Sequence, residues 1–235
     1  MFILKKAKEI ENPDNVLQSA RQHELEKVVI ASTSETYGTA QYVPIDESHP
    51  MVGQSPYSAS KISADQLAIS YNKSFDMPVV IARPFNTYGP RQSARAIIPT
   101  IITQILNDQD KIKLGNLSPT RDFSYVRDTV NGFVSLAKSE KTIGEITNIG
   151  SNFEISMRDT VDLIVDIIGK EVEIITDEKR VRPDKSEVDR LYCDNSKIKE
   201  LTSWKPEYNL EEGLKETIDW LRDNMKFYKP EIYNI

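Results

Sequence analysis

Residues 27–61 constrain the fold more than any other stretch, because they read as a strand, a polar loop and the start of a helix. Residues 27–31 form a short apolar run rich in β-branched side chains, the pattern of a buried parallel strand. At Ser55 and Pro56 the chain has a preferred helix N-cap, followed by the residue favoured at the first helical position. A strand, a loop and a helix in this order predict an α/β fold, in which ligands bind beyond the carboxyl ends of the strands.

Five reactive side chains flank this loop: Thr33, Ser34 and Glu35 follow the strand, and Tyr57 and Lys61 lie at the helix start. Tyr57 and Lys61 are four residues apart, so they point off one face of the helix. A free tyrosine has a pKa of about 10. We expect the lysine ammonium and the helix N-terminus to favour the phenolate, a base that takes a hydroxyl proton while hydride leaves the same carbon. The spacing alone is weak evidence, because a surface pair on a helix has it too.

Several stretches together carry a family resemblance. They are residues 32–38, 55–61, 83–91, 121–128 and 148–150. In this order they resemble the extended short-chain dehydrogenase/reductase family, in its group of NAD-dependent nucleotide-sugar epimerases and dehydratases. Within that group, the stretches from Gln54 to Lys61 and from Asn86 to Arg95 are most similar to 4,6-dehydratases that act on UDP-N-acetylglucosamine.

The resemblance implies a Rossmann-type doubly wound parallel sheet that lacks its first βαβ units, with a smaller interleaved α/β substrate domain. The implied NAD-binding domain spans residues 1–92, to which residues 124–150 return. The implied substrate domain spans residues 93–123 and 151–235. NAD is the implied cofactor, a nucleotide sugar the implied substrate, and a homodimer the implied assembly.

The family reaction assigns a role to each reactive side chain. Tyr57, with Lys61 beside it at the cofactor, takes the C4 hydroxyl proton as hydride leaves C4, and Thr33 hydrogen-bonds the C4 oxygen. Glu35 then removes the acidified C5 proton while the C6 hydroxyl leaves, and return of hydride to C6 gives a 4-keto-6-deoxy sugar. Many dTDP-glucose dehydratases have an aspartic acid where this chain has Ser34. Serine is a poor acid, so Glu35 or a water would protonate the leaving hydroxyl, and a dTDP-glucose substrate is disfavoured.

The resemblance also assigns binding residues. Pro84 and Phe85 would meet the nicotinamide end of NAD, and Asn86, Arg121 and Arg182 would bind the nucleotide sugar. An arginine suits a pyrophosphate, because its planar fork makes bidentate, charge-assisted hydrogen bonds. For Asn86, stabilisation of a turn is the alternative role.

The start of the chain departs from the family. A dinucleotide-binding half begins with a strand and a glycine-rich turn that holds the pyrophosphate, but the first glycine here is Gly38. We therefore expect an N-terminally truncated family member that lacks on the order of 80 to 100 residues of that half. Such a chain is expected not to bind NAD productively and to leave residues 28–30 as an open, apolar sheet edge.

Composition excludes several other classes of protein. The net charge of -6 disfavours a nucleic-acid or anionic-membrane surface. The single cysteine, Cys193, excludes an internal disulfide and is typical of a reducing cytoplasm. His23 and His49 show no metal-ligand spacing, and no apolar run has the length of a membrane span.

Three alternative functions stay open. A UDP-glucuronate decarboxylase shares the Thr-Ser-Glu motif but needs an arginine for the substrate carboxylate. A nucleotide-sugar 4-epimerase needs no base at C5, so Glu35 disfavours it. The missing glycine-rich turn favours a non-catalytic fragment that binds at most a nucleotide sugar or a full-length homologue.

Hydrophobic patterns predict the other elements. Strands are expected at residues 78–82, 145–150 and 172–175, and helices over residues 56–75, 94–106, 129–138, 156–168 and 210–225. Pro99 is expected to interrupt its helix, and Asp128 to start or cap the next. In the charged loop over residues 180–189, Glu187 is expected to be solvated.

Overall fold

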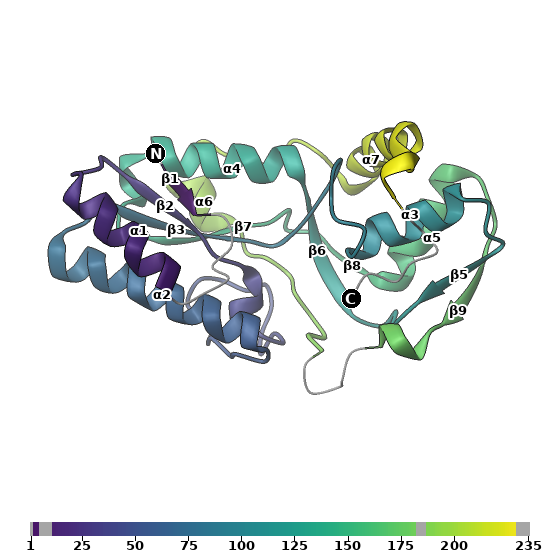
Figure 1. The fold of residues 1–235 in the computed structure, drawn as a ribbon, viewed down its shortest axis with the longest axis horizontal. Coiled ribbons are helices and arrows are strands. Elements are labelled where there is room, and N and C mark those ends of the chain that lie inside the picture. The colour runs from purple at the N-terminus through teal and green to yellow at the C-terminus, as the bar shows by residue number, and fades with distance from the viewer. Residues whose placement is uncertain (1, 5–10, 182–186, 229–235) are drawn as a thin grey trace.

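Figure 1 shows the computed structural model, which describes residues 2–4, 11–181 and 187–228. A four-stranded sheet on one side of the molecule has parallel strands in the order β1-β2-β3-β7. These strands are β1 (Phe2–Leu4), β2 (Val28–Ala31), β3 (Val79–Pro84) and β7 (Ile146–Ile149). The register aligns Ile30 with Ile81 and Ile81 with Ile146, so the apolar strands form a continuous sheet.

Helices cover both faces of this sheet, because buried side chains alternate along each strand. Val28 packs into the core on one face, whereas Val29 packs into the core on the other. The first face is covered by α1 (Glu11–Gln22) and α2 (Pro56–Phe75), and the second by α4 (Val126–Lys138) and α6 (Ser196–Leu201). This arrangement confirms the doubly wound, Rossmann-type α/β fold.

One expectation about the sheet is wrong. β2 is not an open edge, because β1 pairs with it in parallel and aligns Phe2 with Val28 and Leu4 with Ile30. Residues 2–4 are too short a strand to show a periodic signal, and pairing with the longer apolar run determines their conformation.

A second group of strands lies on the other side of the molecule (Figure 1). A three-stranded sheet has the order β4-β6-β8, with β4 and β6 parallel and β8 antiparallel to β6. A separate parallel pair joins β5 to β9. The strands are β4 (Asn86–Tyr88), β5 (Lys111–Leu114), β6 (Thr120–Tyr125), β8 (Glu154–Ser156) and β9 (Glu173–Thr176).

The largest apolar core lies among these strands and three helices. Ile101, Ile164 and Leu214, one from each helix, are fully buried in it. The helices are α3 (Ile97–Leu106), α5 (Met157–Ile168) and α7 (Leu210–Asn224). Short 3₁₀ turns occur at η1 (Ser34–Tyr37), η2 (Glu140–Thr142), η3 (Glu178–Arg180) and η5 (Met225–Phe227).

Two element boundaries differ from the sequence expectation. α3 begins at Ile97, so Pro99 lies in the first helical turn, where its missing N–H costs nothing, and does not interrupt the helix. Asp128 does not cap α4, which begins at Val126. The Asp128 carboxylate instead accepts hydrogen bonds from two backbone N–H groups of the loop before α7, at 3.0 and 3.1 Å.

The first passage of the chain from the main sheet to the second group of strands takes a single residue. β3 ends at Pro84 and β4 begins at Asn86, so Phe85 joins one sheet to the other. We propose that the two groups correspond to the two domains expected from the sequence, residues 1–92 with 124–150 and residues 93–123 with 151–235, except that β4 lies in the second group and α6 packs on the main sheet.

Candidate active site

The turn after β2 positions three of the expected catalytic side chains. Thr33 caps the 3₁₀ turn η1, and its hydroxyl oxygen accepts a hydrogen bond of 3.2 Å from the backbone N–H of Glu35. Ser34 is buried, while Thr33 and Glu35 are partly exposed. A strand end followed by one tight turn therefore presents Thr33 and Glu35 beyond the carboxyl edge of the sheet.

The start of α2 positions the other two expected catalytic side chains, Tyr57 and Lys61. Ser55 forms the predicted N-cap, in a capping box in which its hydroxyl oxygen accepts from the Ser58 N–H at 3.1 Å. Tyr57 is 47% exposed, whereas Lys61 is buried and its ammonium donates to the Ala31 carbonyl at 3.0 Å. The Lys61 Nζ atom lies 6.0 Å from the centroid of the Tyr57 ring. The structure thus brings Lys61 to the end of β2, with the Tyr57 ring beside it.

The electrostatic expectation for this pair is wrong. The pKa of Tyr57 is raised, first by burial and then by the charge of Glu35, while a hydrogen bond with Thr33 lowers it. Lys61 is not among the groups that lower it: its ammonium donates to the Ala31 carbonyl and lies 6.0 Å from the centroid of the Tyr57 ring. Burial also lowers the pKa of Lys61, and the charge of Asp65 opposes that shift.

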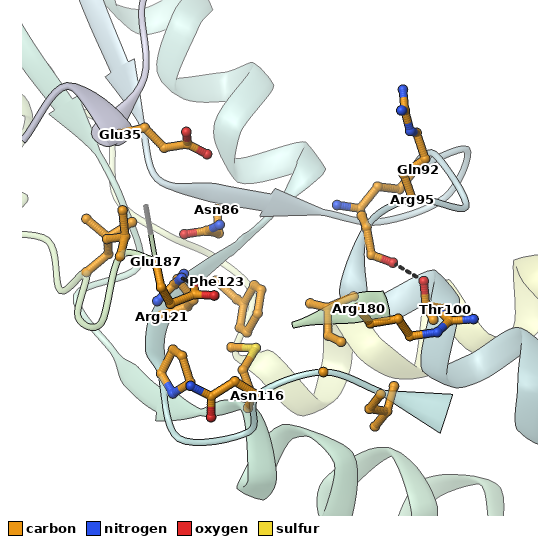
Figure 2. Close-up of a pocket in the computed structure, with 18 of the residues that line it drawn as sticks. Glu35, Asn86, Gln92, Arg95, Thr100, Asn116, Arg121, Phe123, Arg180 and Glu187 are labelled. Carbon is orange, nitrogen blue, oxygen red and sulfur yellow. Dashed lines mark hydrogen bonds and ion pairs between the residues drawn. The ribbon is translucent and has the colours of Figure 1, made fainter. Parts of the chain in front are cut away.

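A pocket of about 360 Å³ lies beside the turn that carries Glu35 (Figure 2). Three of the expected site residues, Glu35, Asn86 and Arg121, line it together, and in this view Asn86 lies between the other two. They come from η1, β4 and β6, elements well separated in the sequence. Other polar lining residues are Thr87, Gln92, Arg95, Thr100, Asn116, Arg180 and Glu187.

The remaining expected site residues lie elsewhere. Among the described residues, Thr33, Ser34, Tyr57 and Lys61 lie outside the lining of this pocket. Pro84 and Phe85 do too: Pro84 ends β3, and Phe85 is buried with its ring centroid 6.5 Å from that of Tyr37. Arg182 lies outside the residues that the structure describes.

Two amide side chains of the pocket have buried oxygens without a hydrogen-bond donor among the described residues. They are Asn86 Oδ1 and Gln92 Oε1. The Gln92 amide nitrogen donates to the Thr87 carbonyl at 2.8 Å, which fixes the amide and leaves the oxygen as the open acceptor. Because a buried acceptor without a partner is costly, both oxygens fit ligand hydroxyl or N–H groups.

Arginines and carboxylates meet in the same pocket. Arg121 Nη2 lies 3.3 Å from Glu187 Oε1, with 12% and 14% of the two side chains exposed. Glu187 is therefore not solvated, and that expectation is wrong: an ion pair with an arginine 66 positions away holds it inside the pocket. Arg180, expected in the charged loop over residues 180–189, is the last residue of η3 and also lines the pocket, with its Nε 3.2 Å from Asp177 Oδ2. The sequence signal that could have identified Arg180 as a site residue is its position two residues before Arg182, which is expected to bind the nucleotide sugar.

Other classes of site are not seen in the described part of the chain. Residues 2–4, 11–181 and 187–228 contain no group of three or more His, Cys, Asp or Glu side chains placed to hold a metal ion. No helix within these ranges is long and apolar enough to cross a membrane.

Comparison with known proteins places the chain in a family. A sequence model of the family described as GDP-mannose 4,6 dehydratase matches residues 12–217. Human dTDP-D-glucose 4,6-dehydratase is 33% identical over 219 residues, which cover 91% of this chain and 61% of the human protein. The chain spans 63% of the dTDP-glucose 4,6-dehydratase of Streptomyces antibioticus, so it corresponds to less than two thirds of either curated relative.

Solved structures agree with this match. The structure of dTDP-glucose 4,6-dehydratase from Bacillus anthracis, in complex with NAD, has a TM-score of 0.83 and 31% identity. The match covers 93% of this chain and 68% of that one. UDP-glucuronic acid 4-epimerase from Bacillus cereus, in complex with UDP-glucuronic acid and NAD, has a TM-score of 0.84 and 29% identity, over 92% of this chain and 67% of that one. The chain therefore belongs to the nucleotide-sugar epimerase and dehydratase family of extended short-chain dehydrogenase/reductase proteins.

Proposed function

We propose that this chain carries the catalytic and nucleotide-sugar-binding residues of an NAD-dependent 4,6-dehydratase. The observation that carries the proposal is the convergence of Glu35, Asn86 and Arg121 on one pocket, beside the turn that follows β2, whose last residue binds Lys61 of α2. A carboxylate, open amide acceptors and buried arginines in one cavity suit a sugar joined to a diphosphate.

Arg121 is the residue proposed to bind the diphosphate. Its side chain is mostly buried at the pocket wall, where a charge-assisted hydrogen bond is stronger than at the surface. Arg180 lines the same pocket and would contribute a second cation. Asn86 and Gln92 would accept hydrogen bonds from sugar hydroxyl or acetamido N–H groups.

The residues at the strand ends fit the nicotinamide end of NAD. Tyr57 is exposed, and among the described residues the buried Lys61 ammonium makes a single hydrogen bond, which leaves donors for ribose hydroxyls. Pro84 ends β3 and Phe85 follows it, at the same sheet edge. A glycine-rich turn for the pyrophosphate does not occur in this sequence, so NAD binding is assigned here only at its nicotinamide end.

The proposed reaction uses the side chains in turn. When bound, NAD supplies a hydride acceptor and a positive ring charge beside Tyr57, whose pKa is otherwise raised. Tyr57 takes the C4 hydroxyl proton, and the Thr33 hydroxyl hydrogen-bonds the C4 oxygen. Glu35, at the pocket wall, removes the C5 proton as the C6 hydroxyl leaves. Because Ser34 is buried and outside the pocket lining, Glu35 is also the group that protonates the leaving hydroxyl.

UDP-N-acetylglucosamine is the proposed substrate. The resemblance of residues 54–61 and 86–95 favours it, and a serine at position 34 disfavours dTDP-glucose. Both dehydratases and epimerases occur among the structural neighbours, so a 4-epimerase is the second candidate. Glu35 at the pocket favours the dehydratase, since only elimination of water needs a base at C5.

A homodimer formed through α2 belongs to this proposal, and sedimentation velocity of the 26.8 kDa chain tests it.

Calorimetric titration tests the binding part of the proposal. We expect UDP and UDP-N-acetylglucosamine to bind the 235-residue chain, and Arg121→Met to weaken both by roughly 10- to 100-fold, as expected for one lost charge-assisted hydrogen bond. Arg158→Met is the matched control, because Arg158 lies exposed on α5, where its side chain pairs with Asp162 one helical turn away. Equal affinities for the wild-type chain and Arg121→Met would contradict the assignment.

A second experiment separates dehydratase from epimerase. In a protein that joins this chain to a glycine-rich dinucleotide-binding half, Glu35→Gln should still oxidise C4, seen as transient NADH absorbance, but should form no 4-keto-6-deoxy product. Normal product formation by that variant would remove Glu35 as the C5 base. A C4 epimer as the only product of the unsubstituted protein would favour the second candidate.

A further inference from the structure

A buried ion pair lies behind Lys61. Arg83 of β3 and Asp65 of α2 are 1% and 0% exposed. The guanidinium contacts Asp65 Oδ2 through Nε at 3.0 Å and through Nη2 at 2.9 Å. Burial of two charges carries a large desolvation cost, so a pair of this kind is weak evidence for stability alone.

The same arginine reaches the turn that carries Glu35. Arg83 Nη1 donates to the Tyr37 hydroxyl at 3.0 Å, and that hydroxyl donates to Asn148 Oδ1 at 2.7 Å. Tyr37 is the last residue of η1 (Ser34–Tyr37) and is fully buried. One guanidinium therefore connects the helix of Lys61, the turn of Glu35 and the strand β7.

Lys61 and Asp65 occupy successive turns of one helix face. They are four residues apart on α2, and both are buried, at 5% and 0% exposure. The titratable and charged groups around Lys61 are Tyr57 on its own helix, Glu35 beyond that phenol, Asp65 one turn later, and Arg83 behind Asp65. β2 contributes the neutral Ala31 carbonyl, and Ser32, which follows β2, contributes its hydroxyl beside Asp65.

We propose that Asp65, held in place by Arg83, is a positioning residue that keeps Lys61 protonated and directed at the end of β2. The proposal rests on the proposed function only in taking Lys61 as part of the active site. A buried ammonium tends to lose its proton, and a carboxylate one helical turn away offsets that tendency. Arg83 fixes the Asp65 side chain through two contacts to Oδ2, and the carboxylate itself carries the charge that acts on Lys61.

The directions in which the pKa values of Lys61 and Asp65 shift agree with this geometry. Burial lowers the pKa of Lys61, and the Asp65 charge is the group that raises it. Burial raises the pKa of Asp65, and Arg83 is the first of the groups that lower it. The Ser32 hydroxyl also lowers it, although its geometry falls short of a hydrogen bond.

NMR titration of Lys61 in the 235-residue chain tests the proposal without substrate or NAD. The side-chain signals of Lys61 in ¹³C- and ¹⁵N-lysine-labelled protein are assigned by their loss in Lys61→Arg. We expect Asp65→Asn to lower the pKa of Lys61 by about one unit, the lower end of the effect of a close opposite charge. Arg83→Met is the matched control: it breaks the same ion pair but leaves the carboxylate, so the pKa of Lys61 should not fall.

The two variants separate a positioning role from a merely structural one. Both lose a buried partner and should unfold at lower temperature, but only Asp65→Asn should change the titration of Lys61. An unchanged pKa in folded Asp65→Asn, or an equal fall in both variants, would overturn the proposal. If either single variant does not fold, the double variant Asp65→Asn/Arg83→Met leaves no unpaired buried charge, and Lys61 should again titrate lower than in the wild type. This result is independent of the UDP titration, so failure of one leaves the other standing.

Discussion

Asp122 is a buried carboxylate whose titration should be visible in the stability of the whole chain. It lies in β6 and is 0% exposed. Its Oδ1 accepts from the Ser151 N–H and hydroxyl, each at 2.7 Å, and its Oδ2 accepts from Asn152 N–H at 2.9 Å and Cys193 N–H at 3.2 Å. Burial nevertheless dominates and raises the pKa of Asp122 to about 6.

The sign of the effect follows from the two pKa values. An unfolded aspartate loses its proton near pH 3.9, whereas the folded chain keeps it until about pH 6. Within that window the folded state binds more protons, so the free energy of unfolding falls as the pH rises. Two pKa units correspond to about 3 kcal/mol, all of it retained below pH 4 and lost above pH 6.

Asp122→Asn isolates this contribution. The amide does not titrate, and its NH₂ group must face at least one backbone N–H, at a cost of about 1–3 kcal/mol. The wild type should therefore exceed the variant most at pH 4, and the gap should shrink by up to about 3 kcal/mol by pH 7. Asp219→Asn, at an exposed position on α7, should shift the stability little at any pH.

Urea unfolding followed by tryptophan fluorescence measures the gap. Trp204 is 4% exposed in the core between the main sheet and α4, so its emission reports on unfolding. Protein at about 1 μM limits precipitation near the isoelectric point of 5.2, which lies inside the titration window. A gap that stays constant from pH 4 to pH 7.5 would refute the reasoning, because it would mean that Asp122 titrates alike in both states.

Two further substitutions test packing and capping. Ser55→Ala removes the hydroxyl of the α2 capping box and should lower the free energy of unfolding by about 1 kcal/mol, as measured by urea unfolding; no loss would show that the cap is not formed in solution. Gly213→Ala would place a Cβ against the hydroxyl of Tyr88 and 2.9 Å from the ring of Tyr125, so calorimetry should show a thermal midpoint lowered by an overpacking cost of about 1–3 kcal/mol. An unchanged midpoint would mean that α7 does not pack as described.

The sequence predicts the elements that have a strong local signal. β2 and α2 lie within two residues of their expected ranges, because a β-branched run, an N-cap serine and a following proline act locally. The same holds for α5, where Ser156 caps the helix as expected. β1, with three residues, has too short a pattern to show periodicity.

The candidate site was predictable where a motif places a residue at a strand end, as for Glu35 and Asn86. Residues whose position depends on a distant partner were not predictable. Glu187 reads as a solvated charge until Arg121 is brought beside it from another strand. The raised pKa of Tyr57 follows first from burial and then from the charge of Glu35, and spacing along a helix fixes neither.

The passage of the chain between sheets at Phe85 has a consequence for its synthesis. After β4 and β6 the chain returns to the main sheet for β7, and only then do the last helices follow. Ile198 and Trp204 complete one core, and Leu214 and Leu221 complete the other. On a ribosome, which releases the chain from its N-terminus, neither core can close before these late residues emerge. We therefore expect the half around the main sheet to become protease-resistant only after residue 204 has left the exit tunnel, and the other half only after residue 221.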